Sequence, residues 1–128
     1  MNPSVYIDPD IDLSSEKNIS VIIEFKTKPA KVAVIEAEAK GIPLTLEEAQ
    51  GQVEESHLIF QKELHELLDK NHIPYTLRHK YTTALNGVSM ELPANEIRSL
   101  AEASSVISKI SLNRKVKLEP PIFPIEQR

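Results

Sequence analysis

Four short stretches of the chain have the hydrophobic pattern of β-strands, in which apolar and polar residues alternate or β-branched residues cluster. They are residues 20–25, 75–85, 88–93 and 105–112. In the first stretch, Val21, Ile23 and Phe25 would share one face of the strand. Ile22 and Glu24 would share the opposite face. The pattern therefore predicts four strands, each with an apolar face that can join a core.

Three segments are predicted to be helical. The longest spans residues 46–70, and its apolar residues recur at helical spacing. They are Ala49, Val53, Phe60, Leu64 and Leu67. Thr45 and Glu48 have the spacing of a capping box, in which each side chain accepts a hydrogen bond from a free N–H group at the helix start. Shorter helices are expected within residues 30–40, which lie between a proline and a glycine, and within residues 93–103.

A turn is predicted where Asn86 and Gly87 separate two alternating stretches. Both residue types tolerate a positive φ, which a type I′ hairpin turn requires at its two central residues. We therefore predict a β-hairpin with Asn86 and Gly87 at its tip.

The predicted order of elements is β-α-β-β-α-β, with an extra short helix in the first crossover. This is the order of the ferredoxin-like split βαβ unit, an α+β fold in which the helices cover one face of a four-stranded antiparallel sheet. The predicted domain spans residues 18–112. Residues 1–17 are acidic and contain proline, which indicates a tail or a segment along the sheet edge. Residues 113–128 begin basic and end rich in proline, which indicates an extended C-terminal tail.

The composition argues against several classes of function. The chain has 128 residues, a net charge of -4 and no Trp, so neither a basic face for phosphates nor an aromatic platform for bases is expected. Cys is absent, which excludes disulfides, zinc–thiolate sites and thiol catalysis. No apolar run has the length of a membrane helix, and the N-terminal residues lack the pattern of a signal peptide. We expect no nucleic-acid, membrane or cofactor binding.

One acidic motif has the spacing of a metal site. Asp8, Asp10 and Asp12 alternate as in the opening of a calcium-binding loop. Leu13 and Ile19, however, occupy the positions at which an EF-hand requires Gly and Glu. We therefore interpret the motif as part of a solvated acidic tail and expect no metal site.

No catalytic residue is predicted. Ser89 lies two residues after Gly87, as in the nucleophile elbow G-x-S-x-G, but Glu91 replaces the second glycine of that motif. His57 and His65 lie too far apart on one helix to share a metal ion, and no His-Glu-x-x-His motif is present. We expect these imidazoles to lie on the helix surface or at the edge of its apolar stripe.

The sheet face opposite the helices is predicted to be open. Its side chains are expected to be Ser20, Ile22, Glu24, Arg78, Thr82, Ser89 and Glu91. Such a face, polar and mostly small, can be plain solvent-facing surface or a docking platform for another protein, and its composition leaves both open. The adjoining tail favours docking, because an extended segment can pair with a strand edge of a partner.

Part of the sequence resembles the propeptide (inhibitor) domain of subtilisin-like serine proteases. The matching parts are the hairpin "NGVSMELP", the helix "EIRSLA" and the strand around Ile107 and Ile110, and "SVIIEFK" resembles that family's first strand. The resemblance covers roughly residues 18–118. It is closest to the propeptides of larger bacterial secreted subtilases, because residues 27–45 add material between the first strand and the main helix.

The resemblance implies a role without catalysis of its own. The open face, with Ile22, Glu24, Ser89 and Glu91, would dock on the protease. The tail would occupy the substrate cleft with Arg114, Lys115, Val116, Lys117, Leu118 and Glu119. The domain would assist folding of its protease, would then be cut off, and would remain bound as an inhibitor of a secreted enzyme.

Two alternatives rest on the same fold. A ferredoxin-like domain can also sense a small molecule or pair its sheet with that of a second copy, which would make it a sensing or dimerisation domain. An acylphosphatase-like enzyme would need an arginine-bearing loop after the first strand. The segment "KTKPAK" offers lysine but no arginine and no glycine cradle, so we discount that activity.

Overall fold

A computed structural model describes residues 5–114 of the chain. The elements are β1 (Tyr6–Ile7), β2 (Asn18–Phe25), α1 (Ala30–Ala39), α2 (Leu46–Leu64), the π-helical turn η1 (His65–Asp69), β3 (Thr76–Tyr81), β4 (Gly87–Pro93), the 3₁₀ turn η2 (Ala94–Glu96), α3 (Ile97–Ala103) and β5 (Ile107–Leu112). The six predicted elements and the extra short helix are all present, in the predicted order.

The strands form one sheet of five strands in the order β1-β5-β2-β4-β3. β2 pairs antiparallel with both β4 and β5, and β3 pairs antiparallel with β4. The expectation of four antiparallel strands is corrected in one respect, because β1 adds a fifth strand parallel to β5. With a length of two residues, β1 is too short to produce a recognisable alternation in the sequence.

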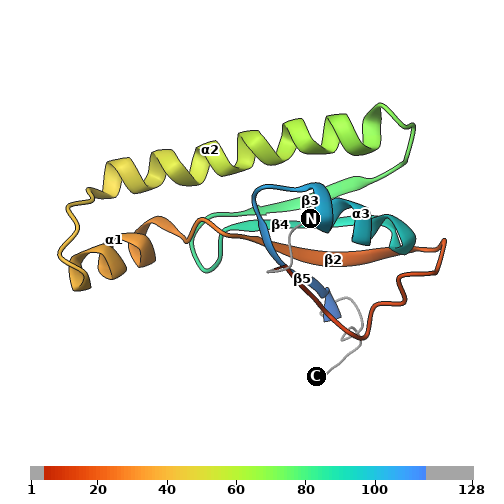
Figure 1. The fold of residues 1–128 in the computed structure, drawn as a ribbon, viewed down its shortest axis with the longest axis horizontal. Coiled ribbons are helices and arrows are strands. Elements are labelled where there is room, and N and C mark those ends of the chain that lie inside the picture. Colours follow the sequence, from red (N-terminus) through yellow and green to blue (C-terminus); the bar gives the residue numbers. More distant parts are fainter. Residues whose placement is uncertain (1–4, 115–128) are drawn as a thin grey trace, which may run out of the picture.

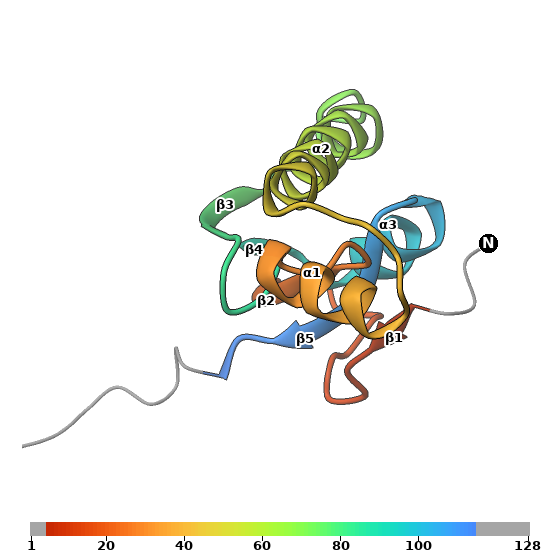
Figure 2. The ribbon, with the colours of Figure 1, turned by 90° about the vertical axis from the view of Figure 1, so that its left-hand side faces the viewer.

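The helices lie on one face of the sheet, as predicted (Figures 1 and 2). Side chains of α2 and α3 pack against β2, β4 and β5 in one core. Its fully buried members include Val21, Ile23, Phe60, Leu64, Leu68, Met90, Leu92, Ile97, Leu100, Ile107 and Ile110. α1 packs on the start of α2 through a second, smaller cluster of Ala30, Ala49 and Val53. The apolar residues that recur at strand and helix spacing in the sequence thus pack against one another between the sheet and the helices.

The predicted capping box opens α2. Thr45 Oγ1 accepts a hydrogen bond from the Glu48 N–H group at 3.0 Å, and Glu48 Oε1 accepts one from the Thr45 N–H group at 2.9 Å. These two bonds satisfy backbone donors that a helix start leaves free. The helix therefore begins where its sequence signal stands.

The predicted type I′ turn at Asn86 and Gly87 is wrong. β3 ends at Tyr81, and residues 82–86 form a longer loop before β4 begins at Gly87. Neither Asn86 nor Gly87 has a positive φ. Gly87 is instead required by close packing, because a Cβ atom there would lie 1.9 Å from the backbone oxygen of Ile23 in β2.

Asn86 is buried and holds the loop to the rest of the domain. Its side-chain amide donates to the Thr27 carbonyl at 2.9 Å and to Ser56 Oγ at 3.0 Å. Its Oδ1 accepts a hydrogen bond from His57 Nε2 at 2.8 Å. The Thr27 carbonyl can only accept a hydrogen bond, so the NH₂ group of the Asn86 amide must face it. The Asn86 oxygen then faces His57, and the His57 ring must carry its proton on Nε2. His57 is therefore part of a buried polar network, which corrects the expectation of a helix-surface position and agrees with the alternative of a position at the edge of the apolar stripe.

Candidate functional site

The second face of the sheet is the one that the described helices leave uncovered. Because alternate residues of a strand point to opposite faces, the register fixes which side chains lie on it. They are Tyr6 of β1, Lys109 and Ser111 of β5, Ser20, Ile22 and Glu24 of β2, Ser89 and Glu91 of β4, and Thr76, His79 and Tyr81 of β3. We call this set the open face. The four residues predicted for docking all belong to it.

In the middle of the open face, the aliphatic side chain of Ile22 lies in a row of polar side chains. Ile22 pairs with Ser89 on one side and with Ser111 on the other, and His79 follows in β3. Ile22 is half-buried, and Ser89 has no exposed surface. A partner would therefore touch the side chains around Ser89 rather than Ser89 itself.

Two ion pairs flank this row. Arg78 donates to both carboxylate oxygens of Glu91, at 2.9 and 3.1 Å, and this pairing lowers the pKa of Glu91. Glu24 has a looser partner in Lys109, at 3.9 Å, and the Lys109 ammonium also lies 5.9 Å from the centre of the Tyr6 ring. Arg78 lies at the irregularity of β3 and so has no place in the register, but its guanidinium reaches the open face through Glu91, as predicted. Glu24 is the carboxylate with more capacity left for an external donor.

Of the predicted cleft residues, the structure describes Arg114, and Lys115–Glu119 lie outside the described residues. The Arg114 guanidinium contacts Asp8 Oδ2 at 2.8 Å and Asp10 Oδ2 at 2.5 Å. Asp8 also accepts hydrogen bonds from the N–H groups of Asp10, at 3.0 Å, and Leu112, at 3.1 Å. These contacts, that of Arg114 first, hold the pKa of the Asp8 carboxyl well below its usual range.

The acidic motif considered above for calcium is therefore explained by an ion pair, and the expectation of a solvated tail is corrected for Asp8, while Asp10 is paired but exposed. Asp8 is buried, and Asp12 accepts hydrogen bonds from Ser14. No local pattern indicates the contact with Arg114, since that residue lies more than a hundred positions away. Within residues 5–114 no group of three or more His, Asp or Glu side chains is placed to hold a metal ion.

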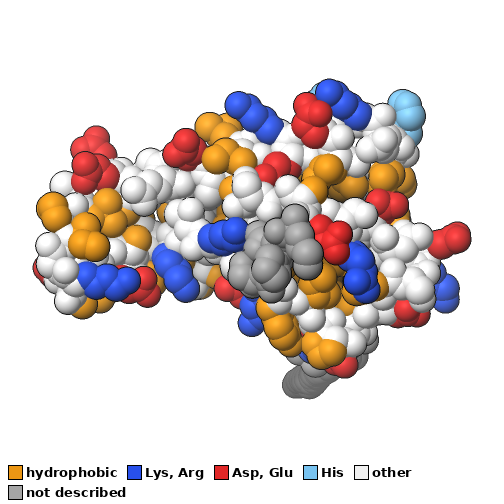
Figure 3. Space-filling model, viewed as in Figure 1, with side chains coloured by type: hydrophobic (Ala, Val, Ile, Leu, Met, Phe, Trp, Pro, Cys, Tyr) orange, Lys and Arg blue, Asp and Glu red, His pale blue; other side chains and the backbone are white. Residues whose placement is uncertain are grey.

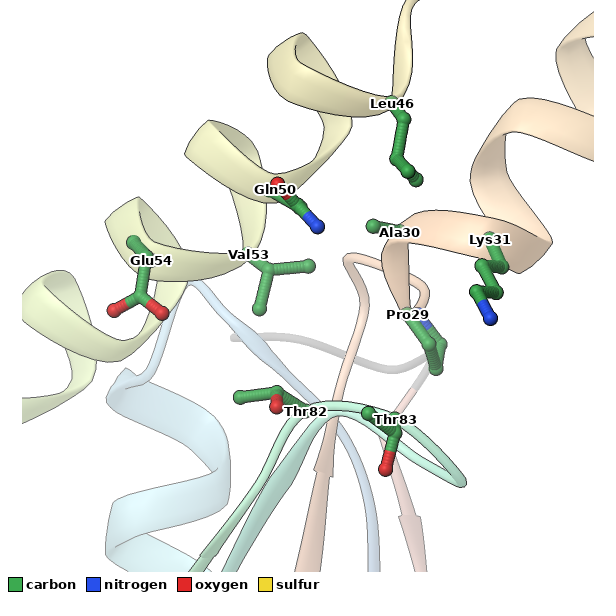
Figure 4. Close-up of a pocket in the computed structure, with 9 residues that line it drawn as sticks. All are labelled: Pro29, Ala30, Lys31, Leu46, Gln50, Val53, Glu54, Thr82 and Thr83. Atoms are coloured by element: carbon green, nitrogen blue, oxygen red, sulfur yellow. The ribbon is translucent and has the colours of Figure 1, made fainter.

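A hollow of about 390 Å³ lies on the helix side, between α1, the start of α2 and the loop after β3 (Figure 4). It is lined by Pro29, Ala30, Lys31, Leu46, Gln50, Val53, Glu54, Thr82 and Thr83. Thr82, which was expected on the open face, borders this hollow instead, because β3 ends before it. Lys31 and Glu54 are the charged residues of the lining, and they do not converge on a shared point (Figure 4). This arrangement gives little support to a specific small-molecule site.

Hydrophobic side chains also gather at the α1 end of the molecule (Figure 3). The large exposed ones there are Val32, Ile35, Ile42 and Leu46. Exposed apolar clusters of this kind are typical of protein contacts. None of the described helices is long and apolar enough to span a membrane.

The sequence model of the peptidase inhibitor I9 family matches residues 20–119. The chain belongs to the peptidase inhibitor I9 family. This family consists of subtilisin propeptides, so the resemblance seen in the sequence is confirmed, and so is the ferredoxin-like class of the fold. An I9 domain is an inhibitor rather than a catalytic unit, and its partners are subtilisin-like proteases. Neither a curated protein nor a solved structure matches the chain.

The family match covers most of the open face and the predicted cleft segment. It begins inside β2 and contains the open-face residues of β2, β3, β4 and β5. It also continues past Arg114 to residue 119, over the stretch expected in the cleft. β1 and the acidic residues Asp8 and Asp10 precede the match, so the family assigns them no role.

Proposed function

We propose that this I9 domain docks its open face on a secreted subtilisin-like protease, while the predicted tail, from residue 115 to residue 119, occupies the substrate cleft. The bound domain blocks substrate access, and during biosynthesis it assists folding of the protease before it is cut off. The observation that carries the proposal is the family match over residues 20–119, which includes both the uncovered sheet face and the cleft stretch.

The open face supports docking by its shape and charge. Ile22 stands at its centre, between the short side chains of Ser89 and Ser111, so a flat partner surface can approach closely. Glu24 is available for the N-terminus of a partner helix, where a negative charge is favoured. Glu91 contributes less, because both of its oxygens are engaged by Arg78.

The position of Arg114 supports the role of the tail. Arg114 lies two residues after the end of β5, the strand next to the sheet edge, so residues 115–119 are joined directly to the sheet. An extended segment can add to a strand edge in a protease cleft, where backbone hydrogen bonds supply affinity and side-chain pockets supply selectivity. Pro120 and Pro121 have no N–H group and limit such pairing to the residues before them.

The folding role follows from linkage. A domain that binds the folded protease and not the unfolded one stabilises the folded form by about 2.7 kcal/mol when its concentration is about 100 times Kd. A domain joined covalently to its protease reaches a high effective concentration, so this stabilisation is present from the start.

The test is inhibition of a purified subtilisin-like protease by the purified 128-residue chain, followed by peptide hydrolysis. We expect a chain that ends at Lys115 to inhibit more weakly than the full chain. We also expect Ile22→Lys to raise the inhibition constant by about tenfold or more, as at the centre of a protein interface. Leu58→Lys is the matched control, because Leu58 is 60% exposed on α2, away from the open face.

Two results would contradict the proposal. One is full activity of the protease at micromolar concentrations of the chain. The other is an equal effect of Ile22→Lys and Leu58→Lys. A stable dimer that dissociates on substitution of Ile22, at the centre of the sheet face, would support the dimerisation alternative instead.

A further inference from the structure

We infer that Asp8 and Asp10 form a clamp on Arg114 that sets the direction in which the inhibitory tail leaves the domain. The inference rests on the proposed function and extends it to residues 5–10, which the family match does not include. In this assignment Arg114 is a positioning residue at the root of the tail, and the contacts with the protease cleft begin after it.

The clamp is built from the two chain segments that meet at the edge of the sheet. The Asp8 N–H group donates to the Ile110 carbonyl at 2.8 Å, which continues the pairing of β1 with β5. Asp8 Oδ2 then accepts from the Leu112 N–H group at 3.1 Å. The side chain of Asp8 thereby takes the place of a further backbone partner along β5, up to the last residue of the strand.

Arg114, two residues after Leu112, is the third member of the clamp. Its two terminal nitrogens bridge Asp8 and Asp10, so the guanidinium has carboxylates on two sides. A planar guanidinium held by several acceptors has a defined orientation as well as a defined position. The neighbouring Asn113 is held too, because its N–H group donates to the Ser20 carbonyl at 3.0 Å. The backbone is therefore fixed up to the point at which the tail begins.

The burial of Asp8 argues against an incidental surface pair. The Asp8 side chain is 8% exposed, whereas Arg114 is 52% exposed and Asp10 is 68% exposed. Isolated exposed pairs contribute little to stability. The buried Asp8 carboxylate is held in place by hydrogen bonds from two backbone N–H groups. It can therefore fix the position of the exposed Arg114 side chain that binds to it.

Such a clamp bears on affinity through pre-organisation. Ordering of flexible groups on binding reduces affinity, so a tail whose point of attachment is already fixed at Arg114 should lose less on entering a cleft. Release of the clamp should therefore raise the inhibition constant by roughly threefold to tenfold. The loss should depend on the presence of the tail.

The experiment is a cycle of variants in the full chain and in a chain that ends at Lys115. Asp8→Asn, Asp10→Asn and Arg114→Gln each remove one member of the clamp. Glu54→Gln is the matched control, because Glu54 forms a cross-element ion pair with Lys80 at 3.0 Å on the helix side. Inhibition constants, melting temperatures and the salt dependence of inhibition are measured for each variant.

We expect the clamp variants to weaken inhibition in the full chain and to have no further effect in the shortened chain. Asp10→Asn should do so without a change in melting temperature, which keeps the test decisive if Asp8→Asn lowers stability. An equal loss in both chains would overturn the inference, because the residues would then act through the fold or by direct contact. Unchanged inhibition by all three variants, with a clear effect of truncation, would overturn the clamp and leave the proposed function standing. Absence of inhibition by the unaltered chain would remove both.

Discussion

Gly87 offers the sharpest test of how this sheet is held together. Gly87 pairs with Glu24 at the start of β4, and an added Cβ would lie 1.9 Å from the Ile23 oxygen and 2.9 Å from the Ile23 carbonyl carbon. Both atoms belong to the backbone of the central strand β2, so no side chain can rotate away. To restore an ordinary contact, β2 and β4 must move apart by about 1 Å. Hydrogen bonds between the two strands, ordinarily about 2.9 Å long, would then exceed the normal range of lengths.

The magnitude follows from two costs. Overpacking of a close contact costs about 1–3 kcal/mol. Loss of a buried backbone hydrogen bond, such as that from the Phe25 N–H group to the Asn86 carbonyl at 2.8 Å, costs about 1–3 kcal/mol more. We therefore expect Gly87→Ala to destabilise the domain by about 3 kcal/mol or more. For a domain of this size that lowers Tm by roughly 10 °C.

The assay is urea and thermal unfolding followed by circular dichroism, with Gly51→Ala as the control. Gly51 lies inside α2 with open space around it, so the same substitution should stabilise the domain by about 0.5–1 kcal/mol. The third variant is Gly87→Asn. If Gly87 served a turn with positive φ, asparagine would be accepted. The close contact predicts that asparagine is at least as harmful as alanine, and a stable Gly87→Asn variant would refute the explanation.

Two further substitutions test local features of α2. Burial lowers the pKa of His57, so the imidazole stays neutral in the folded domain, whereas in the unfolded chain it binds a proton near pH 6.5. The free energy of unfolding is therefore highest above about pH 6.5 and decreases as the pH falls below that value. His57→Gln should flatten the dependence of Tm on pH between about 7.5 and 5, and an unchanged slope would contradict the assignment. Thr45→Ala should cost about 1 kcal/mol through loss of the capping box, while Thr45→Ser should be close to neutral in the same unfolding assay. Equal stability of the alanine and serine variants would show that the cap contributes nothing.

The elements that the sequence predicted well are those with a local cause. The capping box at Thr45 and the apolar stripe of α2 depend on residues within a few positions of each other, so they can be recognised without knowledge of the fold. The alternation in β2 likewise identified its buried side, with Val21 and Ile23 fully buried. The order of these elements is compatible with few arrangements of strands and helices. It therefore predicted that the helices form a single layer on one face of the sheet.

The errors arise where distant parts of the chain meet. Asn86 and Gly87 have the composition of a tight turn, yet Asn86 bonds to Ser56 and His57, and Gly87 makes room for β2. A local pattern cannot distinguish these roles, because the partners lie about thirty or more positions away. Ser89 shows the same limit, since alternation placed it on the open face without revealing that its neighbours bury it completely.

The N-terminal segment changes what the C-terminal tail can do. Without β1, the outer side of β5 would be a free edge, and strand edges of that kind readily pair with other chains. The Asp8 N–H group and carboxylate instead occupy the Ile110 carbonyl and the Leu112 N–H group on that side. A protease cleft therefore cannot add a strand along this part of β5. Backbone pairing with the protease has to start beyond the clamp, which is why we place the inhibitory contacts after Arg114 and give Arg114 itself to the domain.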